Sequence, residues 1–364
     1  MAYRLRTGII NLPLHQGRAP RWLFERMVRL ARELVWILVW EYGREGFLER
    51  LSDPLWFQAL GCVMGFDWHS SGLTTTVCGA LKEALKGREK ELGIFIAGGK
   101  GRKALETPEE IARIGERYSL PSSLENLIQV SRLTAKVDNS CLQDGFQLYH
   151  HILIFTPEGK WGVIQQGMNP ERGWARRYHW LHKEGLNFLN DPHQGIISEW
   201  RGEIFNLATE ESSSARKTIL EMVKDNPLRI SKDLRRIKEI SLPAHHPIKG
   251  IYVDEKRIVR VLREAKEIHP DSFQNLLLQP GIGSKTLRAL ALVAELIYGE
   301  KVSRKDPARY SFAHGGKDGY PYPVNLGTYE ESIEFLKDAV NRARLGNQEK
   351  IHALRRLANL SSRL

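Results

Sequence analysis

Hydrophobic positions recur along this chain with two different spacings, and the change between them predicts where helices give way to strands. Four early segments have the three-to-four-residue spacing of amphipathic helices: 21–42, 74–85, 107–118 and 124–134. The spacing then becomes a two-residue alternation at 147–155 and 160–166, on either side of Pro157-Glu158-Gly159. Alternation around a glycine-containing turn predicts a β-hairpin. From residue 209 onward the helical spacing returns.

These patterns predict an α+β fold with two domains. We expect residues 1–240 to form a mixed domain with a central β-hairpin or sheet, and residues 250–364 to form an all-helical domain. The boundary is predicted at 240–250, because Pro243-Ala244-His245-His246-Pro247 interrupts the helical pattern. A chain of 364 residues is long enough for two or three such units.

Within the predicted helical domain, two apolar helical runs meet at a Pro-Gly turn in residues 271–299. Pro280 and Gly281 end the first run, and Ser284 is the expected N-cap of the second. Glycines let backbone N–H groups approach an anion closely, and the start of a helix adds the positive end of its dipole. The turn is therefore a predicted phosphate-binding site. Its expected DNA contacts are Gly281, Gly283, Ser284, Lys285 and Thr286.

The turn, Gln279-Pro280-Gly281-Ile282-Gly283-Ser284-Lys285-Thr286, resembles the helix-hairpin-helix motif of DNA-repair proteins, with Gln279 in place of the usual leucine. The resemblance implies binding of the DNA backbone without sequence preference. In glycosylases with this motif a hairpin lysine can form a Schiff base, and an aspartate beyond the second helix assists it. Lys285 and Asp306 match these catalytic positions, although the intervening helix is about one turn longer here. Such a lyase needs no cofactor.

Charge and cysteine content agree with an intracellular protein that binds a polyanion. The formal charge is +11 and the pI is about 9.5, values that suit DNA as a partner but are also found in thermophile proteins. Three scattered cysteines are too few for a disulfide framework, so we expect a reducing cytoplasm. The longest apolar run, at 34–40, is too short for a membrane span. A homo-oligomer remains an open alternative.

A second candidate site is the dense polar block at residues 131–180. Asp138, Asp144 and His151 have the composition of a hydrolytic metal site for Mg²⁺ or Mn²⁺, and a β-hairpin would hold them rigidly. Lys136 lies nearby, and Gln165 occupies a position where a nuclease would carry glutamate. This block therefore predicts a metal-dependent nuclease, although no spacing in it is diagnostic.

Strand alternation assigns the polar residues of this block to opposite faces. It predicts that Gln147, Tyr149 and His151 share one face. His150 is then expected on the other, apolar face, with Leu148, Ile152 and Ile154. Further on, Arg176 and Arg177 stand among aromatic residues, a composition that suits DNA phosphates and stacked bases. A packed, salt-bridged surface would have the same composition.

Most of the chain resembles an uncharacterised prokaryotic family, mostly from archaea and thermophiles, that is known only as a domain of unknown function. The resemblance rests on four segments: 131–138, 165–169, 175–180 and 312–319. It implies no activity, so three functions stay open. They are a base-excision glycosylase or AP lyase, a metal-dependent nuclease, and a non-enzymatic DNA-binding protein.

Overall fold

The computed structural model of the chain describes residues 12, 14, 19–66, 70–121, 124–225, 227–239, 255–308, 334, 336–343 and 346–361. Its centre is an antiparallel sheet of five strands in the order β1-β3-β4-β5-β6. The strands are β1 (Phe95–Lys100), β3 (Gln147–Phe155), β4 (Trp161–Asn169), β5 (Trp174–Leu181) and β6 (Gly195–Ser198). A short separate pair joins β2 (Leu142–Gln143) to β7 (Phe205–Asn206). The predicted β-hairpin is thus the middle of a larger sheet.

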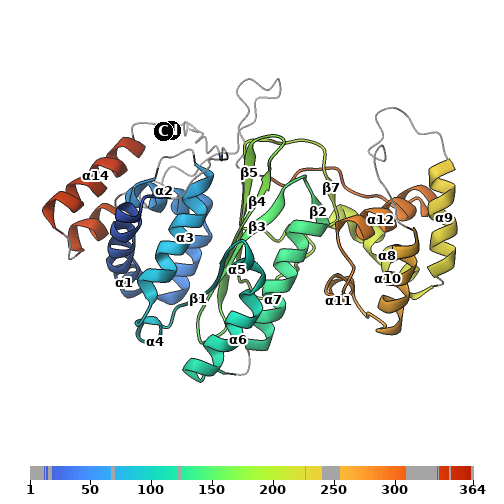
Figure 1. Ribbon diagram of the computed structural model, residues 1–364, viewed down its shortest axis with the longest axis horizontal. Helices are drawn as coiled ribbons and strands as arrows, with labels where there is room; N and C mark the ends of the chain where they lie inside the picture. Colours follow the sequence, from blue (N-terminus) through green and yellow to red (C-terminus); the bar gives the residue numbers. More distant parts are fainter. Residues whose placement is uncertain are drawn as a thin grey trace, which may run out of the picture.

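One face of the sheet is covered by helices from both ends of the chain (Figure 1). They are α1 (Arg21–Ser52), α2 (Pro54–Met64), α3 (Ser71–Leu85), the short α4 (Glu89–Leu92) and, outside them, α14 (Asn347–Ser361). Their apolar sides share a core with Ile152, Ile154 and Ile164 of the sheet. The first helix is longer than predicted, because it continues past a kink at Gly43, where φ is +71°.

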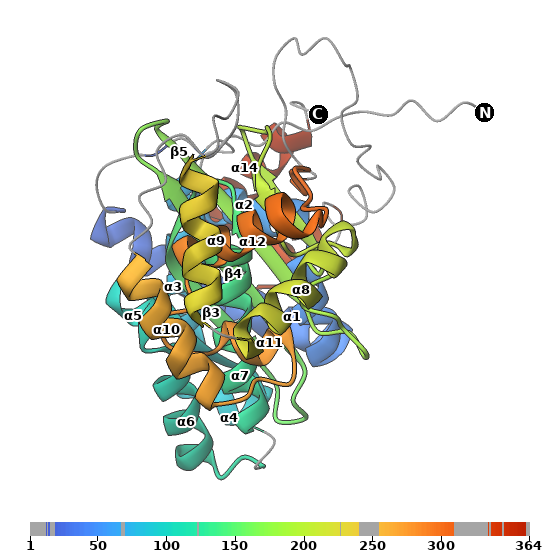
Figure 2. The ribbon, with the colours of Figure 1, turned by 90° about the vertical axis from the view of Figure 1, so that its right-hand side faces the viewer.

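The opposite face is covered by the middle of the chain (Figures 1 and 2). Near the sheet lie α5 (Arg102–Leu105), α6 (Thr107–Tyr118) and α7 (Leu124–Lys136), which passes into the π-helical turn η1 (Val137–Cys141). Beyond them lie η2 (Glu210–Ser212), α8 (Ser213–Lys224), α9 (Pro227–Glu239), α10 (Glu255–Glu267), α11 (Phe273–Leu277) and α12 (Ser284–Tyr298). Apolar residues of all these longer helices form one continuous core with this face of the sheet.

Several helices pack across the predicted domain boundary, and the division into two domains itself stays a prediction. Helices α8 and α9, expected in the first domain, pack against α10 and α12. Helix α14, expected in the second domain, packs against α2 on the far side of the sheet. The predicted linker at 243–247 and the family segment at 312–319 lie outside the described residues. Within the described residues, no helix has the length and apolarity needed to cross a membrane.

The predicted alternation along β3 holds only from His150 onward. The pairing of β3 with β4 shifts by one residue between Leu148 and His150, which is a β-bulge at Tyr149. Leu148 consequently packs against the α7 side, and the Tyr149 hydroxyl bonds Gln166, whose side chain reaches α3. The prediction was therefore wrong for these two residues. His150 and His151 do lie on opposite faces, as expected.

Candidate active site

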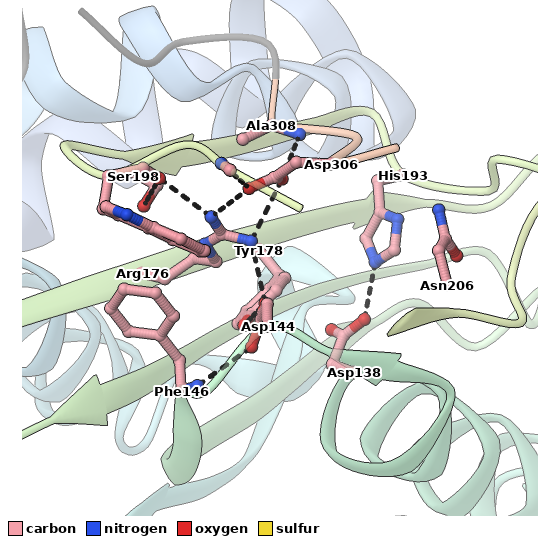
Figure 3. Close-up of polar contacts among 12 residues, drawn as sticks. Asp138, Asp144, Phe146, Arg176, Tyr178, His193, Ser198, Asn206, Asp306 and Ala308 are labelled. Atoms are coloured by element: carbon pink, nitrogen blue, oxygen red, sulfur yellow. Dashed lines mark hydrogen bonds and ion pairs between the residues drawn. The ribbon is translucent and has the colours of Figure 1, made fainter. Parts of the chain in front are cut away.

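The centre of the polar block is Asp138, a fully buried residue on the turn η1. Its Oδ2 accepts hydrogen bonds from Gln165 Nε2 at 2.5 Å and from Trp180 Nε1 at 2.9 Å. Its Oδ1 lies 2.5 Å from Nε2 of His193 (Figure 3). Single π-helical turns of this kind are frequent at functional sites. Three donors therefore hold one carboxylate in a fixed orientation.

A chain of hydrogen bonds extends from Asp138 through the sheet to α7. Oε1 of Gln165 accepts from Nδ1 of His151 at 2.8 Å, and Nε2 of His151 lies 2.9 Å from the Ser131 hydroxyl. Burial lowers the pKa of His151 to about 4, so the ring is neutral at pH 7. A neutral ring that donates from Nδ1 must accept at Nε2, so the Ser131 hydroxyl donates. In this series of hydrogen bonds, each donor therefore points toward Asp138: Ser131 donates to His151, and His151 donates to Gln165. Gln165 in turn donates to Asp138.

A second buried cluster surrounds Arg176, whose guanidinium lies between two carboxylates (Figure 3). It donates to Asp144 at 2.9 Å and to both oxygens of Asp306 at 3.1 and 2.7 Å. Tyr178 also donates to Asp144, at 2.7 Å. Burial raises the pKa of Asp144, and Arg176 opposes this effect. Although burial opposes ionisation of Arg176 as well, the two carboxylates raise its pKa above the ordinary value.

Both clusters border a cavity of about 140 Å³. His193, which is 8 % exposed, and Asp306 contribute to its wall, together with Asp191 and Arg201. Nδ1 of His193 has no hydrogen-bond partner among the described residues, so it is the nitrogen left for a ligand or a water molecule. Arg201 is exposed and has no ion-pair partner in the part of the chain that the structure describes. The cavity therefore combines a histidine oriented by a carboxylate with one unpaired cation.

The same turn η1 is tied to the predicted phosphate-binding turn. Lys136 Nζ donates to the carbonyl of Ile282 at 2.7 Å, and Gln143 Nε2 donates to that of Ser284 at 2.8 Å. Thr286 Oγ1 bonds the Gly281 carbonyl at 3.0 Å and fixes the turn from within. Lys136 and Gln143 lie close in sequence to Asp138, the residue that orients His193. They thus connect this aspartate to the predicted phosphate-binding turn.

The conformation of the turn depends on its glycines. Gly281 has φ +78°, and a Cβ there would lie 2.6 Å from Val261, so only glycine fits without strain. A Cβ on Gly283 would meet open space. The N-cap of α12 is Gly283 and not, as expected, Ser284, which is already its first helical residue. Lys285 is exposed beside it.

The residues predicted for the metal-dependent nuclease are only partly brought together. Asp138, His151 and Gln165 belong to one network, whereas Asp144 belongs to the cluster of Arg176, and Lys136 bonds the turn. Both ring nitrogens of His151 already have partners. Among the described residues, no group of three or more His, Cys, Asp or Glu side chains is arranged to hold a metal ion. The three predicted ligands do not converge.

Two other sets of predicted residues have internal partners. Arg176 and Arg177 are fully buried and bonded within the protein, so in this conformation no DNA phosphate can reach them. Asp306 is 8 % exposed, and both of its oxygens bond Arg176. No hydrogen bond or ion pair joins it to Lys285 among the described residues.

Sequence reasoning missed several residues of the site, above all His193, which follows the polar block at 131–180 in the segment Asp191-Pro192-His193. It also missed Ser131, Tyr178, Trp180 and Arg201, although three of them stand inside or beside the block. The available signal was a row of polar residues in strands with apolar neighbours. Such residues must find buried partners, and histidine and aspartate are the commonest ones for catalysis.

Comparison with known proteins gives one match. A family model described as "Protein of unknown function (DUF763)" matches residues 8–324, which is most of the chain. No curated protein and no solved structure matches the chain.

Proposed function

This chain belongs to the DUF763 family, whose description assigns no activity, and from its own site we propose that it is a DNA-processing enzyme that hydrolyses N-glycosidic bonds. In this proposal the turn at 280–286 holds the DNA backbone, and the cavity at His193 receives the sugar of one nucleotide. The proposal rests chiefly on a single observation: a histidine oriented by a buried carboxylate in the wall of a cavity that also contains two aspartates.

The turn supports the DNA-binding part. Its geometry agrees with the helix-hairpin-helix resemblance, since two helices meet at a turn that needs glycine at Gly281. Because no described residue lies within 4 Å of a Cβ added at Gly283, the start of α12 is open to a phosphate group. The exposed Lys285 and the formal charge of +11 favour the same partner.

The charge balance around the cavity supports cleavage of a glycosidic bond in preference to a phosphodiester bond. The wall of the cavity contains two carboxylates, Asp191 and Asp306, and one guanidinium group, that of Arg201. Two further carboxylates lie behind it, Asp138 bonded to His193 and Asp144 bonded to Arg176. Cleavage at the anomeric carbon of a sugar passes through a cationic, oxocarbenium-like transition state, which carboxylates stabilise. Phosphodiester cleavage places additional negative charge there and requires an excess of cations.

His193 then acts as a general base. Asp138 fixes the proton on Nε2 and leaves the lone pair of Nδ1 for a water molecule. The water oxygen forms a bond to C1′ of the sugar while the C1′–N bond breaks, and its electron pair leaves with the base. Nδ1 takes the proton of the water, and the released base is protonated by solvent. The lyase alternative uses Lys285 as nucleophile, but its assisting residue Asp306 is engaged by Arg176.

The test is an activity screen on labelled damaged, abasic, branched and single-stranded DNAs, with and without EDTA. We expect the protein to release a base, and this reaction should persist in EDTA. His193→Gln should lower the rate of base release about 100-fold or more without weakening DNA binding. The matched control is His352→Gln on α14, which should be as active as the wild type. A fully active His193→Gln enzyme would remove the dyad from the reaction.

The screen also separates the alternatives. Strand cleavage that EDTA abolishes would support the metal-dependent nuclease. Borohydride cross-linking to abasic DNA that Lys285→Ala loses, and that Lys285→Arg also loses, would support the lyase, because guanidinium stays protonated. DNA binding without any reaction product would support a non-enzymatic DNA-binding protein. For binding itself, Gly283→Asp should lower affinity for all sequences alike, because it places a carboxylate against the phosphate.

A further inference from the structure

Three pairs of identical polar residues lie in the central strands: His150-His151, Gln165-Gln166 and Arg176-Arg177. Because side chains alternate along a strand, each pair sends one member to each face of the sheet. His151, Gln165 and Arg176 belong to the site described above. The other three members lie beneath α2 and α3: His150, Gln166 and Arg177.

These three residues form one row across the sheet. His150 is opposite Gln166 in the pairing of β3 with β4, and Gln166 is opposite Arg177 in that of β4 with β5. At the edge strand, Lys100 is opposite His150. Residues directly opposite one another in an antiparallel sheet have Cβ atoms about 5 Å apart. The row therefore places three buried polar side chains side by side.

Each of the three has hydrogen-bonding capacity that no atom of the described residues meets. His150 is 1 % exposed; neither of its ring nitrogens forms a hydrogen bond of normal geometry with a described residue, although the Gly99 backbone near the ring acts to raise its pKa. Gln166 donates to the Ser71 carbonyl at 3.0 Å, but its Oε1 accepts from no described residue. Arg177 donates to Gln58 at 2.8 Å, to Thr74 at 3.3 Å and to the Pro54 carbonyl at 3.4 Å, while its Nε–H has no partner among the described residues. Buried polar groups are rarely left in this state in a native protein.

The charge of the row is also unbalanced. Arg177 is fully buried, yet it forms no ion pair with any carboxylate among the described residues. Burial lowers its pKa to about 9, and the thiols of Cys78 and Cys62 oppose this only in part. Burial also lowers the pKa of His150 to about 3, with smaller contributions from His151 and Lys100. A buried cation without a counter-charge is costly and favours the entry of an anion.

We propose that His150, Gln166 and Arg177 form a binding site for a small oxyanion of the phosphate type. The unmet groups comprise a donor, the Nε–H of Arg177, and an acceptor, Oε1 of Gln166, with a histidine that can serve as either. Phosphate at neutral pH carries oxygens that accept and a hydroxyl that donates. Chloride and sulfate at this pH only accept. The site lies on the opposite face of the sheet from the His193 cavity and is independent of the proposed reaction there.

The test measures thermal unfolding of the full chain in phosphate against chloride and sulfate at equal ionic strength. At phosphate concentrations far above its dissociation constant, we expect the melting temperature to rise by about 3 °C or more, and by less in sulfate. Arg177→Met should be stable in chloride and should no longer respond to phosphate. His150→Leu should lose the response as well, which keeps the test informative if Arg177→Met does not fold.

The matched control is Lys285→Gln, because the turn at 280–286 is the other candidate phosphate site. It should keep the full phosphate response of the wild type. If Lys285→Gln abolishes the response, the stabilising phosphate is at the turn and the proposed site is wrong. The absence of any phosphate-specific stabilisation in the wild type would overturn the proposal equally.

Discussion

Arg176 and Arg177 follow one another on β5, yet the two faces of the sheet give them opposite electrostatic surroundings. On the α7 face Arg176 lies between Asp144 and Asp306, and both carboxylates raise its pKa. Among the described residues, Arg177 on the α3 face has only neutral partners, and burial lowers its pKa to about 9. The histidine and glutamine pairs follow the same rule: within the described part of the chain, every polar side-chain atom of His151 and Gln165 has a partner, and some of those of His150 and Gln166 do not. The described residues thus leave fewer polar groups of these pairs without partners on the α7 face than on the α3 face.

The largest expected effect comes from removing one arginine at a time. Arg176→Met would leave two buried carboxylates without their counter-charge, which typically costs about 3–5 kcal/mol of unfolding free energy. Arg177→Met removes an uncompensated charge, so we expect its stability in phosphate-free buffer to stay within about 1 kcal/mol of the wild type or to rise. Urea unfolding at pH 7 measures both. Equal losses in the two variants would contradict the difference between the faces.

The next effect is a loss of stability in acid. Both His150 and His151 are neutral in the folded protein, with pKa values lowered to about 3 and about 4, whereas an unfolded histidine has its ordinary pKa of 6.5. The unfolded chain therefore takes up more protons below about pH 6.5, and the stabilisation present above that pH is lost as the pH falls. At pH 5 the loss is about 2 kcal/mol for each residue.

Single variants separate the two histidines. His150→Leu should remove its share of the pH dependence at little cost at pH 7, because its ring forms no hydrogen bond of normal geometry with a described residue. His151→Leu should remove a similar share but also destabilise the protein at pH 7, because Ser131 and Gln165 lose their partner. Unfolding followed from pH 7 to pH 4 measures this. An unchanged slope in both variants would mean that other groups dominate acid unfolding.

Local patterns predicted the β-hairpin, the Pro-Gly turn and the separation of His150 from His151, because these features depend on neighbours a few residues apart. The grouping of Asp138, His151 and Gln165 also followed, since all three stand close to the hairpin. In contrast, His193 is 55 residues from Asp138, and Asp306 is 130 residues from Arg176. No local pattern specifies such pairs. The bulge at Tyr149 was missed because no glycine or proline marks it.

The predicted division into two domains stays a prediction, for a related reason. The interruption at 243–247 is a real change in composition, but whether helices on its two sides share a core depends on packing across the sequence. Leu262 of α10 and Ile219 of α8 lie in the same buried core, on opposite sides of the predicted boundary. Amphipathic helices reveal which side is buried but not against which partner it packs.

A smaller effect than the combined loss from the two histidines is expected from the two adjacent glutamines. Gln165→Leu would leave Nδ1–H of His151 buried without an acceptor and remove one donor from Asp138, at a cost of about 2–3 kcal/mol. Gln166→Leu loses the bonds to the Ser71 carbonyl and the Tyr149 hydroxyl, and also removes an acceptor that has no partner in the part of the chain that the structure describes. We expect about 1 kcal/mol for that change. Thermal or urea unfolding of the two variants measures this difference. A larger loss of stability for Gln166→Leu than for Gln165→Leu would reverse the comparison.

The smallest predicted effect tests the direction of the network on the α7 face. Ser131→Ala removes the donor to Nε2 of His151, and the loss of one buried hydrogen bond should cost about 1 kcal/mol. If His151 donates from Nδ1, this variant leaves only an unmet acceptor on the ring, and the bonds from His151 through Gln165 to Asp138 persist. Base release by the proposed reaction should then fall much less than in His193→Gln. Nitrogen NMR of the imidazole should show the same tautomer in Ser131→Ala as in the wild type. A switch to the other tautomer would mean that Ser131, and not Gln165, fixes the proton on His151, and that the network has the opposite direction.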